Sequence, residues 1–153
     1  MTVAQSPSDP EPAARKAIMG LLARATAAEL RDIAVLADGA VTTLRAPEVG
    51  LVMVRGRIGG DGAPFNLGEA TVTRAAVALP GGEIGFGHVL GRDRERARLA
   101  ALGDALWQCP DHRPAVEQAV AGIRSRLAAE AQAQRERTAA TRVDFFTMVR
   151  GED

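Results

Sequence analysis

Cys109, Asp111 and His112 are the closest group of side chains in this sequence that could do nucleophilic chemistry. A thiol becomes a nucleophile when a base such as histidine lies within hydrogen-bond reach and a substrate pocket adjoins both. The segment Cys109-Pro110-Asp111 also closes a predicted helix, where such clusters are far more often capping and turn groups. We therefore interpret the group as turn chemistry and expect no catalytic residue in the chain.

A second group of residues has the chemistry of an anion site. Glycines in Gly59-Gly60-Asp61-Gly62 would let the main chain approach a phosphate closely. Arginine captures phosphate or carboxylate through its planar fork of donors. A hairpin loop and surface ion pairs are the competing interpretations. The candidates for phosphate or interface contacts are Arg57, Gly59, Gly60, Arg74 and Arg92.

Composition excludes several classes of function. Two histidines and one cysteine form no zinc signature, and the sequence has no GxSxG, GxxxxGK[ST] or GxGxxG element in a suitable setting. We expect no metal and no cofactor in this chain. Lys plus Arg and Asp plus Glu balance at 19 each, so no net charge attracts nucleic acid. The start resembles no signal peptide and no apolar run approaches ~18 residues, which predicts a cytoplasmic protein without a membrane partner.

The elements that must position these residues change in character along the chain. Residues 1–11 form a Ser/Pro/Asp-rich leader that we expect to be disordered. Pro12 opens a predicted helix over 13–25, and the capping-box spacing of Thr26 and Glu29 starts a second, which ends before Asp38-Gly39. The pair predicts a short helical hairpin.

Four β-rich runs follow, at 41–46, 51–58, 70–79 and 84–90, broken by Pro47, by the glycine loop and by Pro80-Gly81-Gly82. They predict a four-stranded antiparallel meander. Helical periodicity returns from Asp93, a natural N-cap, with Asp104 among the polar positions of that helix. Pro114 opens a long final helix whose second half, from Gln132, has no large apolar residue to bury, and we expect that half to project or to bridge to another subunit.

The last residues are apolar at a chain end, where polypeptides usually fray. This tail must be buried somewhere, either on its own sheet or on a partner. The polar spacer before it favours the partner. The predicted partner-binding residues are Arg142, Val143, Asp144, Phe145, Phe146, Thr147, Met148, Val149 and Arg150. The sequence thus predicts an α+β fold with one domain over 12–141 and a docking tail over 142–153.

Several stretches together resemble the PhnG family of bacterial carbon–phosphorus lyase subunits. The resemblance lies in residues 50–52, 57–62, 68–77 and 91–93, and above all in 142–151 (RVDFFTMVRG). It runs in order from the first helix to the C-terminus, and only the leader and the stretch from Cys109 to Val120 are unspecific. The tail is its most specific element.

This resemblance implies a role in phosphonate catabolism. In that family the subunit joins partners lettered H, I and J in a symmetric core complex, with the I subunit the most direct partner. With the H, I and L proteins it supports attack of a phosphonate on the ribose of ATP, which releases adenine. The iron–sulfur cluster and S-adenosylmethionine belong to a partner subunit, and ATP is a substrate of the complex. The resemblance carries no catalytic residue over to this chain.

Two further hypotheses stay open beside the assembly subunit. The chain could be a stand-alone regulatory domain that senses a phosphonate or nucleotide through the glycine loop and arginines. It could also be a hydrolase that uses Cys109, Asp111 and His112.

Overall fold

The computed structural model describes residues 12–141; the predicted leader (1–11) and docking tail (142–153) lie outside the described residues. Within this range the elements follow in the order α1 (Pro12–Leu22), α2 (Ala27–Ala34), β1 (Thr42–Arg57), β2 (Pro64–Ala78), β3 (Ile84–Leu90), α3 (Arg94–Gln108) and α4 (Arg113–Ala140). The α+β class is confirmed. None of these helices is long and apolar enough to cross a lipid bilayer.

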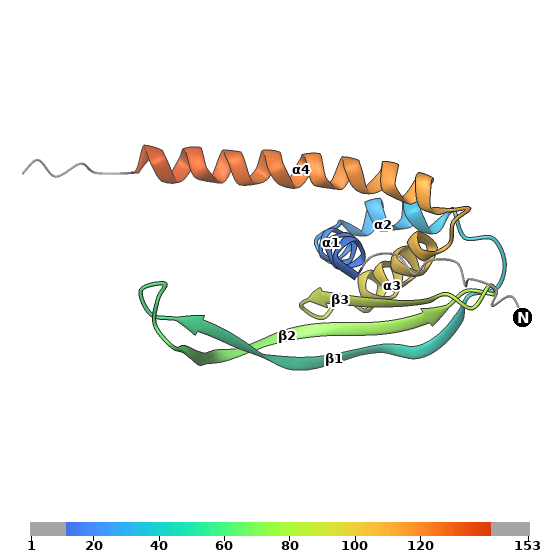
Figure 1. Cartoon of the computed structure of the whole chain (residues 1–153), viewed down its shortest axis with the longest axis horizontal. Helices are drawn as coiled ribbons and strands as arrows, with labels where there is room; N and C mark the ends of the chain where they lie inside the picture. Colours follow the sequence, from blue (N-terminus) through green and yellow to red (C-terminus); the bar gives the residue numbers. More distant parts are fainter. Residues whose placement is uncertain (1–11, 142–153) are drawn as a thin grey trace, which may run out of the picture.

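The helices cover one face of an antiparallel sheet with the strand order β1-β2-β3. Helix α3 lies on the sheet, and α1 and α2 pack against α3 (Figure 1). Helix α4 packs on α1, α2 and α3, on the side away from the sheet. The largest fully buried side chains come from every layer and include Leu22, Leu30, Ile33, Val77, Val89, Leu106, Val116, Val120 and Ile123.

Helix α3 approaches β3 unusually closely because both surfaces are small. A Cβ placed on Gly85 would collide with the backbone of Ala101 and Ala105, and one on Gly87 would collide with that of Ala97. The facing alanines of α3 are almost completely buried. Glycine on the strand and alanine on the helix therefore set the distance between sheet and helix layer.

The prediction of four strands is wrong by one, because the first two predicted runs form a single strand. Strand β1 continues through Pro47, where the register against β2 shifts between Arg45 and Glu48. Proline lacks the N–H that a central strand must donate, but it is accepted at bulges and in edge strands. β1 is an edge strand of the sheet, so Pro47 bends it without ending it.

The N-terminal helices begin as predicted but differ in detail. The capping box is present: Glu29 N–H donates to Thr26 Oγ1 at 3.2 Å, and Thr26 N–H donates to Glu29 Oε2 at 2.8 Å. Both helices end about three residues earlier than the spacing predicts. They form no hairpin, because each packs against α3 and α4, and Figure 1 shows α1 nearly end-on while α2 runs across the view.

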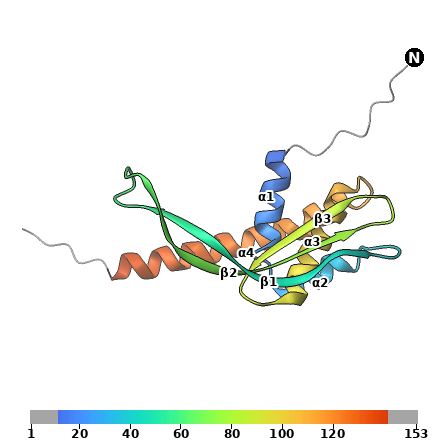
Figure 2. The same ribbon diagram turned by 90° about the horizontal axis from the view of Figure 1, so that it is seen from below.

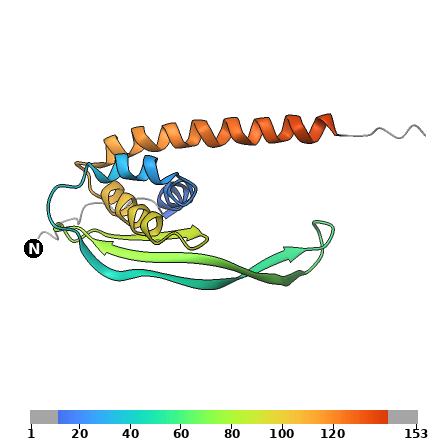
Figure 3. The same ribbon diagram turned by 180° about the vertical axis from the view of Figure 1, so that it is seen from behind.

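Two projections extend from this body. Strands β1 and β2 continue beyond the last residue that β3 pairs, Val72, as a two-stranded ribbon. The half of α4 beyond Leu127 is exposed almost throughout, as its composition predicts. Both projections leave the body on the same side (Figures 1 and 3).

Candidate functional site

The group of Cys109, Asp111 and His112 sits at the turn between α3 and α4, as predicted. Cys109 is the C-cap of α3, and His112 precedes the first residue of α4. The imidazole Nε2 of His112 lies 2.9 Å from Asp38 Oδ1, in the loop after α2. Its hydrogen-bond partner is thus a carboxylate that ties α4 to that loop, which supports the interpretation as turn chemistry.

Arg57 and the glycine loop form the tip of the β1–β2 ribbon. Gly59 and Gly60 have φ angles of 65° and 84°, in the left-handed region that favours glycine. The Arg57 guanidinium donates to the Gly62 carbonyl at 3.3 Å and so braces the loop. Arg57, Gly59 and Gly60 are all exposed.

Arg74 belongs to an ion-pair cluster on the sheet face away from the helices. Its Nε donates to Glu48 Oε1 at 2.7 Å, and Arg45 donates to the same oxygen at 2.7 Å. Hydrogen bonds from Arg74 and then from Arg45 lower the pKa of Glu48 below its usual value. The cluster joins β1 to β2 across the bulge at Pro47.

The structure does not bring the three candidate arginines together. Arg57 is paired with Pro64, ten residues along β2 from Arg74, which is roughly 30 Å of extended strand. Arg92 lies between β3 and α3 and is exposed; the neighbouring Asp93 carboxylate caps α3 by accepting from Arg96 N–H at 2.9 Å. These positions define no shared phosphate pocket.

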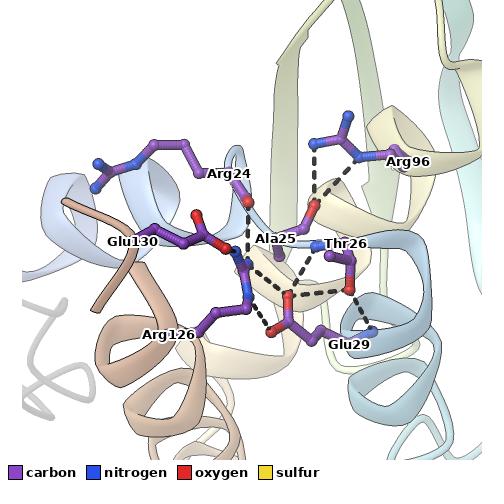
Figure 4. A network of polar contacts seen from close by, with 7 residues as sticks. All are labelled: Arg24, Ala25, Thr26, Glu29, Arg96, Arg126 and Glu130. Atoms are coloured by element: carbon purple, nitrogen blue, oxygen red, sulfur yellow. Dashed lines mark hydrogen bonds and ion pairs between the residues drawn. The ribbon is translucent and has the colours of Figure 1, made fainter. Parts of the chain in front are cut away.

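A polar network that the sequence foreshadows only in part clamps α4 to the N-terminal helices (Figure 4). Arg126 of α4 donates to both carboxylate oxygens of Glu29, at 2.7 and 2.8 Å. Hydrogen bonds from Arg126 lower the pKa of Glu29 from 4.5 to about 2, against the opposite effect of partial burial. Arg96 of α3 donates to the Ala25 carbonyl in the same loop. The capping box predicted one half of this network, and no signal marked Arg126.

Another cluster covers the start of the free edge of β3, and sequence reasoning missed it. Asp104 of α3 is completely buried, although its polarity suggested an exposed position. Its Oδ2 accepts from Phe86 N–H at 2.9 Å, and Arg15 and Gln108 both donate to the Ile84 carbonyl. At the start of β3, the outward N–H of Phe86 and the outward carbonyl of Ile84 are therefore occupied by side chains of α1 and α3.

Within residues 12–141, more than half of the exposed large apolar side chains lie on the β1–β2 ribbon, which we call the β-arm and define as residues 51–71. Its large side chains are exposed by 37% to 77%: Leu51, Val52, Met53, Val54, Ile58, Phe65 and Leu67. Because strand neighbours point to opposite faces, the run from Leu51 to Val54 places apolar side chains on both. Monomeric proteins rarely expose so much contiguous apolar surface unless it binds something.

Residues 12–141 contain no group of three or more His, Cys, Asp or Glu side chains placed to hold a metal ion. The predicted partner-binding residues 142–150 lie outside the described residues, so that prediction stays a prediction. The α+β fold with its exposed apolar β-arm is typical of proteins that contact other proteins.

Comparison with known proteins agrees with this class. Residues 13–151 match the family model described as phosphonate metabolism protein PhnG, so the chain belongs to the PhnG family. It is also 55% identical over 155 residues to the alpha-D-ribose 1-methylphosphonate 5-triphosphate synthase subunit PhnG of Rhizobium meliloti (strain 1021). That match covers 100% of this chain and 99% of the relative. The resemblance seen in the sequence is confirmed.

Proposed function

We propose that this chain is a subunit of α-D-ribose 1-methylphosphonate 5-triphosphate synthase and acts in phosphonate catabolism. The complex forms its product from ATP and methylphosphonate with release of adenine. The observation that carries the proposal is the 55% identity, over the full length of both chains, to a protein named as a subunit of that synthase. The chain's role in the complex is mainly assembly.

The assembly role is supported by the contacts of the polar residues. His112 binds Asp38, Arg74 binds Glu48, and Arg57 binds its own loop. Each of these side chains is engaged in holding the fold, which is what a scaffold requires. Attack at an anomeric carbon needs a substrate held in place and shielded from water, and a neighbouring subunit assists this by shape and charge.

The partners of the proposal are the H, I and J subunits of the carbon–phosphorus lyase core complex, with the L protein acting alongside them in the cytoplasm. The docking tail 142–153 binds the I subunit. Iron–sulfur and S-adenosylmethionine chemistry belongs to a partner, and this chain holds no cofactor of its own.

Reconstitution tests the proposal directly. The H, I and L proteins with ATP and methylphosphonate should release adenine only when this chain is added. Deletion of residues 142–153 should prevent co-purification with the I subunit, whereas deletion of residues 1–11 serves as the matched control and should not. Full synthase activity without this chain would overturn the proposal.

Calorimetry on the isolated chain separates the rival sensor hypothesis. An assembly subunit should give no binding heat with ATP or methylphosphonate when its partners are absent. Binding of either ligand by the isolated chain would favour the stand-alone sensor.

A further inference from the structure

Side chains cover the start of the β3 edge of the sheet, whereas the β1 edge at positions 49–54 is left open. On β3, Phe86 N–H and the Ile84 carbonyl face outward and are occupied by Asp104, Arg15 and Gln108. Such covering prevents an exposed strand from pairing with another chain. On β1, no hydrogen bond within residues 12–141 reaches the outer backbone of positions 49–54.

The register identifies which groups of β1 face that open edge. Gly91 N–H donates to the Thr71 carbonyl at 2.9 Å, so Thr71 directs its backbone groups away from β1. Thr71 is opposite Leu51. Because the backbone groups of Thr71 point toward β3, this pair exchanges no hydrogen bonds, and the backbone groups of Leu51 point away from β2. By alternation, the N–H and C=O groups of Val49, Leu51 and Met53 point outward.

The features that protect the edge of β1 from pairing end just before the β-arm begins. The part of β1 beside the body has a proline, two register shifts and the ion pairs of Glu48, all devices that discourage strand pairing. Positions 49–54 (VGLVMV) have none of them and keep a regular register with β2. An unguarded edge with apolar side chains on both faces is suited to strand addition.

The area of the β-arm indicates what kind of occupant covers it. A fully exposed large apolar side chain presents on the order of 150–200 Å² to solvent. From their exposed fractions, the seven apolar residues of the β-arm together expose on the order of 600 Å². A stable protein interface buries about 800 Å² per partner. A two-stranded ribbon is also marginal by itself in water. The β-arm therefore has the size of a principal interface.

The root of the β-arm extends this surface toward α4. A hollow of about 590 Å³ is lined by Val72 and Leu90 of the sheet, Leu127 of α4, and the side chains of Arg24 and Arg96 among others. From this root the β-arm and the exposed half of α4 project to the same side, as the view from below also shows (Figure 2). One partner placed there would contact both projections.

We propose that the edge of β1 at positions 49–54 receives an extended apolar strand from a different subunit of the synthase, which also covers the faces of the β-arm. This inference rests on the proposed function. A second copy of the chain paired edge to edge would extend the ribbon but leave the same apolar faces in water. A partner with its own core covers edge and faces together.

Amide hydrogen exchange at single-residue resolution tests the edge. The amides of Val49, Leu51 and Met53 should exchange rapidly in the isolated full chain and become at least about tenfold slower in the assembled synthase. Those of Gly50, Val52 and Val54 already pair with β2 and should change less. Unprotected Leu51 and Met53 amides in an assembled complex would overturn the inference while leaving the proposed function intact.

Substitution at Met53 provides an independent test. Met53→Pro removes an outward N–H that the chain does not use, and proline is tolerated at such edge positions. It should weaken co-purification with the partner subunits on the order of tenfold relative to Met53→Thr, which keeps the N–H. Val35→Asp, at an exposed apolar position after α2, should assemble normally.

Two outcomes distinguish the possible failures. If the wild-type chain forms no complex with the synthase subunits, the proposed function itself fails. If the isolated chain is a dimer in which Val49, Leu51 and Met53 are already protected, the occupant is a second copy and the inference is wrong. Equal assembly of Met53→Pro and Met53→Thr would also contradict it.

Discussion

Arg15 and Asp104 form a bidentate ion pair between α1 and α3, with distances of 3.0 and 2.7 Å across 89 positions of sequence. The carboxylate of Asp104 is fully buried, whereas about a quarter of the Arg15 side chain (27%) remains accessible. Asp104 also accepts from Phe86 N–H, so a single carboxylate links α1, α3 and the edge of β3. Arg15 further lies over the Phe86 ring, 5.8 Å from its centroid.

Removal of Arg15 should be costly because a buried charge would lose its partner. We expect Arg15→Met to lower the free energy of unfolding by about 2–4 kcal/mol, measured by urea denaturation of the isolated chain. Arg31→Met is the matched control, since Arg31 makes a similar fork to Glu95 with both side chains more than half exposed. That control should cost less than about 1 kcal/mol. Equal losses for both variants would contradict the assigned role.

The Glu29–Arg126 pair predicts a specific dependence of stability on pH. Because the pKa of Glu29 falls from 4.5 to about 2 on folding, its charge stabilises the fold above pH 4.5. That contribution is lost as the pH falls from 4.5 toward 2. Glu29→Gln keeps the capping geometry but removes the charge.

The test measures the free energy of unfolding of the wild type and of Glu29→Gln as a function of pH. At pH 7 the free energy of unfolding of the wild type should exceed that of Glu29→Gln by about 1–2 kcal/mol. This range is reduced because the ion pair is partly exposed to solvent. The difference should disappear near pH 2. Parallel stability curves for the two proteins between pH 7 and pH 2 would show that the ion pair contributes nothing.

Local features of this fold were predictable because their causes lie close together in sequence. The capping box of Thr26 and Glu29 and the cap at Asp93 depend on contacts three residues apart, and both are present. The long final helix followed from Pro114 at its start and from apolar residues at helical spacing after it, and its exposed second half followed from the absence of large apolar residues beyond Gln132. Hydrogen bonds between residues three apart mark the starts of α2 and α3.

Long-range pairing explains the misses. From the sequence alone, Asp104 is a polar residue expected on the exposed face of a helix. In the structure its carboxylate accepts from Phe86 N–H at the edge of β3, 18 positions away. Pro47 reads as a strand break until β1 proves to be an edge strand. The candidate arginines were chosen by residue type alone, and spacing carries no information on which of them meet. The β-arm was hidden because its apolar run has no clear alternation, which fits a ribbon exposed on both faces.

The close approach of α3 to β3 gives a prediction about glycine. A Cβ at Gly87 would meet the backbone of Ala97 and Ala101, which has little freedom to move. We expect Gly87→Ala to lower the free energy of unfolding by about 3 kcal/mol, since overpacking here forces sheet and helix apart. Gly68→Ala is the control, because nothing lies within 4 Å of a Cβ there. Thermal unfolding should separate the two variants, and a neutral Gly87→Ala would show that the layers adjust.

The turn between α3 and α4 provides a decisive test of whether this chain does chemistry. His112 contacts Asp38, whose side chain is 86% exposed, so the pair should contribute less than about 1 kcal/mol. We expect His112→Ala and Cys109→Ala to keep adenine release by the assembled synthase within about twofold of wild type. Loss of an essential base or nucleophile would instead reduce turnover on the order of a hundredfold or more. Such a loss, with assembly and stability unchanged, would place a catalytic group at this turn and end the interpretation of the chain as an assembly subunit.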